Sequence, residues 1–197
     1  MANNGTIYLF KELGNIYIVN VQIFNHKTMH FNYTTYNLRH DYNIINSWKH
    51  ANVMAVSLFF DPSTNSATDE HPFIYAHVLG IYHADFVHMK LETSSTSAYT
   101  LEFVLAHWYQ QDTTFDARFQ HHRLYRLHLL PSKNEDTFSF LDPDNIICGC
   151  HLIPAFAHGK SDDRCMPSIN EEDTVHLWNL YYVNWWGMIL FLEYVSC

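Results

Sequence analysis

The sequence contains few glycines and prolines, which interrupt regular secondary structure, and few cysteines, which can cross-link a chain. Its 197 residues include 6 glycines, 6 prolines and 4 cysteines, against 14 phenylalanines, 13 tyrosines and 5 tryptophans. Hydrophobic residues make up 48% of the chain, which is enough apolar surface to offset the entropy of folding and excludes extensive disorder. Length and composition fit one compact domain, or one domain with a flanking arm. Such a core needs neither disulfides nor a metal.

Basic residues are also scarce. The chain has 11 Lys and Arg against 20 Asp and Glu, which gives a formal net charge of −9. Neutralisation of phosphates supplies most of the affinity of a nucleic-acid binder, so this acidic excess argues against strong direct binding of nucleic acid. One short basic cluster is present, and it consists of Arg118, His121, His122, Arg123 and Arg126.

Targeting and membrane-spanning signals are missing as well. Residues 1–14 lack a charged stretch followed by an apolar one, so no signal peptide is expected. The apolar segment near the end runs uninterrupted only from residue 185 to 192, far short of the about 20 residues that cross a bilayer. The 4 cysteines form no disulfide framework typical of secreted proteins. We expect a nuclear or cytoplasmic protein that is not secreted and has no membrane partner.

Common catalytic motifs are absent. The chain has no G-x-S-x-G, no P-loop, no G-x-G-x-x-G and no H-E-x-x-H. Its adjacent acids, at residues 69–70, 162–163 and 171–173, lie in polar stretches where exposure to solvent is the ordinary outcome. We therefore predict no enzymatic activity and no cofactor.

Short runs rich in β-branched and aromatic residues dominate the sequence, and turn residues separate them. This pattern favours a mainly β protein built as a small bent β-barrel. Gly80, within one of these runs, predicts a bulge or a close approach of the backbone. The predicted strands span residues 16–24, 29–36, 53–60, 73–83, 99–109, 123–130 and 145–153.

We divide the chain into an irregular N-terminal arm with a possible strand (residues 1–28), the barrel (29–160), and an acidic linker with an aromatic apolar tail (161–197). Acids at the start of the tail suit a helix N-terminus, whereas its Trp, Tyr and Val content suits a strand, and both alternatives stay open. Segment 151–159 is expected to seal the barrel with Leu152, Ile153 and Phe156, because Pro154 stops further strand pairing. With Trp108 at the rim, the expected core is Ile81, Phe103, Leu105, Leu127, Ile146, Leu152 and Phe156.

One set of aromatic residues has the composition of a cage for an alkylated ammonium group, which rings bind by cation–π attraction. A carboxylate at Asp112 or Asp116 would lie nearby. The same rings fit an ordinary barrel core and rim equally well, so both interpretations stay open. The candidate binding residues are Tyr75, Tyr82, Trp108, Tyr109 and Phe115.

A group of cysteines and histidines suggests zinc, because thiolate and imidazole are the ligands that zinc prefers. Only one residue separates Cys148 from Cys150, which is closer than structural zinc sites require. On a strand, these cysteines face one side and His151 the other, and buried free cysteine is common as a small apolar residue. We predict no metal and keep zinc as the less favoured alternative, with candidate ligands Cys148, Cys150, His151, His158 and Cys165.

Several segments taken together resemble a known family. They are HFNYTTYNLRHDYNIIN (30–46), HANVMAVS (50–57), HPFIYAHVLGIYHADFVH (71–88), LEFVLAHWYQQD (101–112), HHRLYRLHLLP (121–131), FSFLDPDNIICGCHLIPAFAHGK (138–160) and LWNLYYVN (177–184). In this order they resemble the C-terminal region of proteins encoded by fungal Plavaka-type DNA transposons, which are relatives of the CACTA (En/Spm) class. The resemblance covers residues 27–184, and NYTTY, the LDP step and HLIPAFAHG are its most specific parts.

The resemblance implies that the family's catalytic domain lies upstream and that this region is a non-catalytic module. Apolar and aromatic positions within 75–81, 103–109 and 142–147 also resemble bromo-adjacent homology (BAH) domains, which are bent β-barrels that bind chromatin proteins. The implied partners are a chromatin protein or other transposon-encoded segments. Two alternatives remain: a zinc-stabilised scaffold or metal-dependent transposase or nuclease accessory fragment, and a non-functional remnant of a decayed element.

Overall fold

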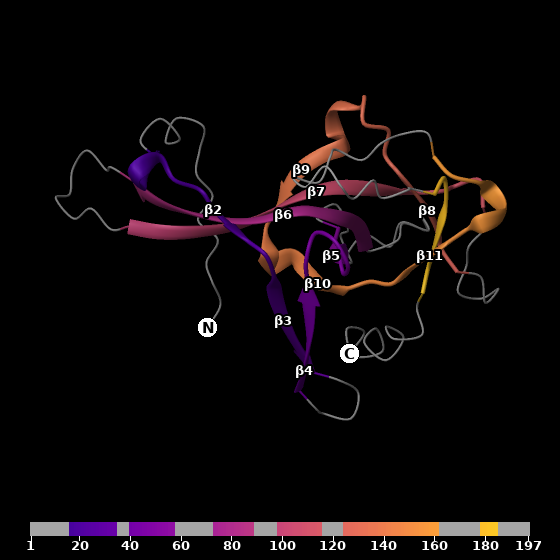
Figure 1. Cartoon of the computed structure of the whole chain (residues 1–197), viewed down its shortest axis with the longest axis horizontal. Coiled ribbons are helices and arrows are strands. Elements are labelled where there is room, and N and C mark those ends of the chain that lie inside the picture. Colours follow the sequence, from indigo (N-terminus) through magenta and orange to yellow (C-terminus); the bar gives the residue numbers. More distant parts are fainter. Residues whose placement is uncertain are drawn as a thin grey trace, which may run out of the picture.

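The computed structural model describes residues 16–34, 40–57, 73–88, 98–115, 124–161 and 178–184, which form strands and short 3₁₀ turns (Figure 1). The predicted mainly β class is confirmed. The strands are β1 (Ile16–Ile18), β2 (Phe24–His26), β3 (Met29–Thr34), β4 (His40–Ile45), β5 (Asn52–Val56), β6 (Phe73–His88), β7 (Ala98–Gln111), β8 (Arg126–Leu129), β9 (Phe138–Leu141), β10 (Ile146–Gly149), β11 (Leu152–Pro154) and β12 (Tyr181–Val183). The 3₁₀ turns are η2 (Val19–Val21), η4 (Glu135–Thr137), η5 (Pro143–Asn145) and η6 (Phe156–His158).

The main sheet is antiparallel and curls back on itself. Its strand order is β10-β5-β6-β7-β8-β12-β11, with β1 and β2 paired to β6 and β9 paired to β7. The outer strands of this order, β10 and β11, are consecutive in the chain. The Cys150 amide donates to the Asn52 carbonyl (2.8 Å), and the Asn184 amide donates to the His151 carbonyl (2.9 Å). The chain therefore passes directly from one edge of the curl to the other, which agrees with the predicted small bent β-barrel.

Every strand of the curl supplies a side chain to one apolar cluster. Because residues on a strand alternate between its faces, a cluster shared by all these strands fills the inside of the curl. We call it the barrel cluster, and it consists of Met54, Tyr75, Tyr109, Leu127, Cys148, Leu152, Tyr181 and Val183.

The opposite face of the sheet carries a second cluster, to which the β3–β4 hairpin contributes. Ile45 is buried in it, and Met29 and Phe31 pack against it, while the far end of the hairpin extends away from the sheet (Figure 1). We call this the outer cluster, and its buried members are Ile45, Val53, Ala55, Ala76, Val78, Ile81, Val104, Ala106, Leu141 and Ile146.

A buried asparagine turns the chain from this hairpin into β5. The Asn46 carboxamide oxygen accepts hydrogen bonds from the amides of Trp48 (3.2 Å), Lys49 (2.6 Å) and His50 (3.2 Å). A side chain that satisfies three backbone donors replaces the pairing lost at the end of β4, as asparagine does at many turns.

The central strands β6 and β7 continue beyond the barrel, away from β8 and β11 (Figure 1). We call their outer part, residues 80–87 paired with 98–105, the ribbon. It begins at a shift in pairing register between Val78 and Gly80, so the predicted bulge at Gly80 is confirmed. The ring of Tyr82 lies against Gly80 where a Cβ atom would collide with it, which explains the glycine.

Part of the predicted core is wrong. Ile81, Leu127, Ile146 and Leu152 are buried, and Phe103 and Leu105 are half-buried, but Phe156 is 66% exposed. The physical reason is the end of pairing at Pro154, after which the chain turns into η6. There the Phe156 ring contacts only the edge of Trp178 (4.8 Å between centroids) among the described ring contacts. Leu152 thus seals the barrel and Phe156 does not.

Several strand boundaries differ from the sequence prediction. Residues 16–24 form β1 and the start of β2, separated by Asn20 and Val21 at positive φ values of 55° and 54°. Strands β4, β9, β11 and β12 were not predicted as separate elements. Within the tail, residues 181–183 form a strand, and residues 185–197 lie outside the described part of the chain. No helix in the described part is both long and apolar enough to cross a membrane.

The barrel cluster predicts a large difference between two leucine truncations. Leu127→Ala removes a side chain that is 1% exposed inside the curl, and we expect it to lower the free energy of unfolding by about 2–5 kcal/mol. The matched change Leu101→Ala affects an exposed ribbon residue and should cost no more than about 0.5 kcal/mol. Urea unfolding followed by tryptophan fluorescence measures both. Equal costs would contradict the placement of Leu127.

Candidate functional site

Two of the five candidate aromatic residues lie inside the barrel. Tyr75 and Tyr109 are directly opposite each other on β6 and β7, and both belong to the barrel cluster. The Tyr109 hydroxyl donates to the Asn52 carboxamide oxygen (3.0 Å), and its ring meets the edge of Tyr181 (5.7 Å). Burial raises the pKa of the Tyr75 hydroxyl above its ordinary value, and the nearby Cys150 adds to the effect. The rings of Tyr75 and Tyr109 are therefore part of the barrel core.

Trp108 lies on the other face of the sheet, because it follows His107 and precedes Tyr109 on a strand. Its indole packs against the outer cluster, and the indole N–H donates to the Ser139 hydroxyl on β9 (2.6 Å). The structure therefore does not bring Trp108 together with Tyr75 and Tyr109.

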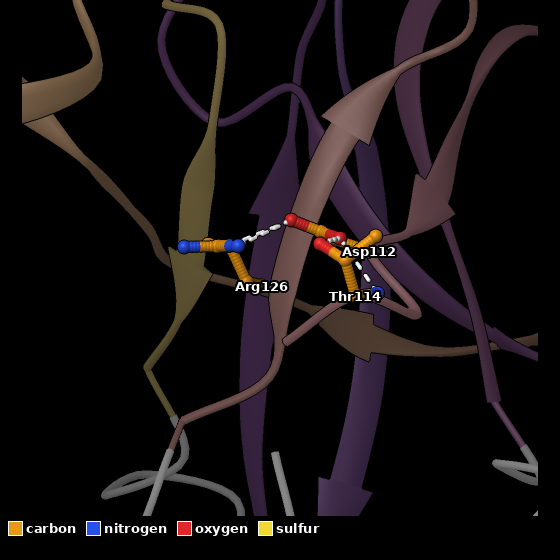
Figure 2. A network of polar contacts seen from close by, with 3 residues as sticks. All are labelled: Asp112, Thr114 and Arg126. Atoms are coloured by element: carbon orange, nitrogen blue, oxygen red, sulfur yellow. Dashed lines mark hydrogen bonds and ion pairs between the residues drawn. The ribbon is translucent and has the colours of Figure 1, made fainter. Parts of the chain in front are cut away.

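The Phe115 ring is in contact with a cationic side chain of the protein itself, that of Arg126. The Arg126 guanidinium carbon lies 4.3 Å from the ring centroid, which is a cation–π contact. Arg126 also binds Asp112, which accepts from the arginine Nε (2.8 Å) and lies 2.6 Å from Nη2 (Figure 2). The Thr114 hydroxyl (2.5 Å) and amide (3.0 Å) donate to the other carboxylate oxygen.

These contacts connect the end of β7 to β8. The hydrogen bond from the Thr114 hydroxyl, together with the bonds from Arg126, holds the pKa of Asp112 below its ordinary value despite partial burial. Arg126 pairs in register with Tyr182 on β12, whose ring meets the edge of Phe115 (6.1 Å). This network stabilises the barrel. Asp116, the other carboxylate considered with the rings, lies outside the described residues, as do residues 118–123 of the basic cluster.

Tyr82, the fifth candidate, belongs to a row of rings on the ribbon. It stacks on Phe103 (5.6 Å between centroids), which meets the edge of Phe140 on β9 (5.3 Å). Farther out, Phe86 stacks on Tyr99 (5.6 Å). Strand alternation and the register place these side chains on one side of the ribbon, continuous with the inside of the barrel. We call this surface the ribbon face, and it consists of Tyr82, Phe86, Tyr99, Leu101, Phe103 and Phe140.

The ribbon face is open to solvent. Tyr99 is 51% exposed, Leu101 53% and Phe140 69%. Of its residues, the sequence prediction had included only Tyr82 as a site candidate. The signal for the others was the alternation of Leu101 and Phe103 with Glu102, which marks one apolar face of a strand. Of these residues, the sequence prediction placed Phe103 in the core.

The ribbon strands carry acids and no bases. Strands β1, β2, β6, β7 and β9 contain no Lys or Arg, whereas Asp85 and Glu102 lie on the ribbon; beyond the strands, Lys27 follows β2, and Asp142 and Asp144 follow β9. The Thr100 hydroxyl donates to Asp85 (2.6 Å). Thr100 and Glu102 alternate with Tyr99 and Leu101 on β7, so Asp85 and Glu102 lie on the side of the ribbon opposite the ribbon face and bias that reverse side towards cationic ligands.

A polar cluster lies where the barrel meets the ribbon. His77 Nδ1 lies 2.9 Å from the Asn52 oxygen that also accepts from Tyr109, so His77 donates through Nδ1. His107 lies opposite His77 and bonds the Leu130 carbonyl through Nε2 (2.7 Å). Burial, reinforced by His107, lowers the pKa of His77 to about 4. His77 is therefore neutral at neutral pH and acts as a hydrogen-bonding core residue.

The residues considered for zinc are dispersed. Cys148 belongs to the barrel cluster and Cys150 packs against it, while His151 and His158 are exposed. Burial raises the pKa of the Cys148 thiol to about 11 and also raises that of Cys150, so both thiols stay protonated. Cys165 lies outside the described residues. Within the described ranges, no three His, Cys, Asp or Glu side chains are arranged to hold a metal ion.

Comparisons with protein families, with characterised proteins and with solved structures found no match to this chain. The fold and the site define a mainly β, barrel-type domain with an exposed apolar ribbon face.

The partly buried, desolvated imidazole of His77 predicts a pH dependence of stability. The unfolded chain protonates His77 near its ordinary pKa of 6.5, whereas the folded protein does so near 4. Between these two pKa values the unfolded state binds more protons than the folded state, so the free energy of unfolding should fall as the pH is lowered from about 6.5 to 4. Below pH 4, His77 should cause no further decrease. The variant His77→Gln should flatten this slope, whereas His158→Gln, at an exposed position, should not. Identical slopes in urea titrations of the protein and His77→Gln would contradict the assignment.

Proposed function

We propose that this chain is a non-catalytic binding module whose ribbon face contacts another protein. The observation that carries the proposal is the row of exposed apolar side chains, above all Tyr99, Leu101 and Phe140, on one side of two paired strands. Contiguous exposed apolar patches on a folded domain mark interaction surfaces. The rings of Tyr82 and Phe103 at its centre are stacked and half-buried, so they lose little side-chain entropy on binding.

The partner class follows from the resemblance to the C-terminal region of Plavaka-type transposon proteins. We propose a module derived from such a protein, located in the nucleus or the cytoplasm, which binds a chromatin protein or another transposon-encoded segment. The bent barrel supports the BAH-like part of that resemblance at the level of architecture only. The Asp85 and Glu102 carboxylates on the reverse side of the ribbon suit a partner that also carries basic residues, such as a histone tail.

The alternative of a zinc-stabilised scaffold has less support. It requires thiolates, whereas Cys148 and Cys150 are buried against apolar side chains and their pKa values are raised. Of the candidate aromatic residues, Tyr82 remains a proposed binding residue because it lies on the ribbon face. Tyr75, Trp108, Tyr109 and Phe115 are assigned to structural roles by their contacts.

The test removes apolar area from the ribbon face. The double variant Leu101→Ser with Phe140→Ser should weaken binding to a panel of unmodified and lysine-methylated histone-tail peptides by about tenfold or more, because both side chains are lost from the contact. Trp48→Ser, at an exposed ring outside the ribbon, is the matched control and should bind as the parent does. Fluorescence polarisation measures the affinity, and circular dichroism verifies the fold. Absence of binding by the parent, or unchanged binding by the double variant, would refute the proposal.

A further inference from the structure

One edge of β7 is only partly paired. Its inner edge pairs with β6 along the whole ribbon, from Ala98 onwards. Its outer edge pairs with β9 from Val104 to His107 and with β8 from Tyr109 to Gln111. Among the strands that the structure describes, none pairs with the outer edge of residues 98–103. A strand edge of this kind presents backbone donors and acceptors to an incoming strand.

The end of β9 explains why no described strand pairs with this edge. Strand β9 ends at Leu141, opposite Val104, and the chain then turns into η5, which stays close to β7 without pairing to it as a strand. Asp142 accepts from the Asp144 amide (3.0 Å) and begins the turn η5, and Pro143 has no N–H to donate to β7. An added strand would pair with the same edge of β7, beyond the point where β9 ends.

We infer that the open edge of β7 binds an extended segment of a partner protein by strand addition, and that this segment alternates apolar and basic residues. The inference rests on the proposed function and specifies the partner's chemistry. Leu101 and Phe103 point to the ribbon face, whereas Glu102, paired with His83, points to the other side. Side chains of an added strand would lie beside these residues. Those on one side of the added strand would contact the aromatic rings, and those on the other side would lie near the Glu102 carboxylate.

Charge favours a basic partner over a second copy of this chain. The strands around the edge carry no Lys or Arg, and the carboxylates nearby in the sequence and pairing are Asp85, Glu102, Asp142 and Asp144. Pairing of two such edges would bring together acidic surfaces of chains that each carry a net charge of −9. Like charges opposed across a contact suppress association, whereas lysine or arginine there is attracted.

The experiment uses the full chain and short end-blocked peptides of valine and lysine. The alternating peptide should bind more tightly than a peptide of the same composition arranged in two blocks, and more tightly than alternating valine and glutamate. Methylation of its backbone amides, which removes donors to the strand edge, should weaken binding by about tenfold. Glu102→Lys should weaken it by about fivefold, while Asp136→Lys, which makes the same charge change beyond the far end of β9, should not.

The possible outcomes separate this inference from the proposed function. If the methylated or block peptide binds as well as the alternating one, and the Leu101→Ser, Phe140→Ser variant still loses binding, the ribbon face is a contact surface and strand addition is wrong. If Glu102→Lys binds unchanged, the basic character of the partner is wrong. If the chain forms dimers in sedimentation that Glu102→Lys alters, a second copy occupies the edge and the inference fails. If binding depends on neither backbone amides nor the ribbon face, both proposals fail.

Discussion

The fold depends on one crossing of the chain between the two outer strands of its sheet. At Cys150 the backbone still pairs with β5, and at the next residue, His151, it pairs with the segment that contains β12. These hydrogen bonds make β10 and β11 neighbours in space as well as in sequence. Because every strand of the curl supplies a residue to the barrel cluster, that cluster is shielded from water only when the two edges meet.

The closure gives the two central strands two different environments. Inside the barrel, Tyr75 and Tyr109 are buried, and the Tyr109 hydroxyl donates to Asn52. On the same side of the same strands but beyond the bulge at Gly80, Tyr99 and Leu101 face solvent. The neutral His77 and its partner His107 lie at the boundary. The binding surface we propose is thus the part of the barrel's inner face that extends past the barrel.

Local patterns predicted much of this fold. Short runs rich in apolar, β-branched and aromatic residues located β5, β6, β7 and β8, and Gly80 marked the bulge because only a residue without Cβ fits under Tyr82. Strand β4 was missed because half of its sequence, HDYNII, is polar, and β9 because it is short. The crossing at Cys150 and the open edge of β7 arise from pairing between distant segments, which no local pattern encodes.

The candidate site was predicted less well, for a related reason. Rings were grouped by residue type and nearness in sequence, but strand alternation puts Trp108 and Tyr109 on opposite faces, and Phe115 binds Arg126. The most direct test of the closed curl is amide hydrogen exchange by NMR. Closure predicts that the Cys150 and Asn184 amides are protected as strongly as the Val78 amide, which donates to Ala51 in the sheet centre. Exchange of Cys150 and Asn184 at the rate of an unfolded peptide, with Val78 still protected, would contradict it.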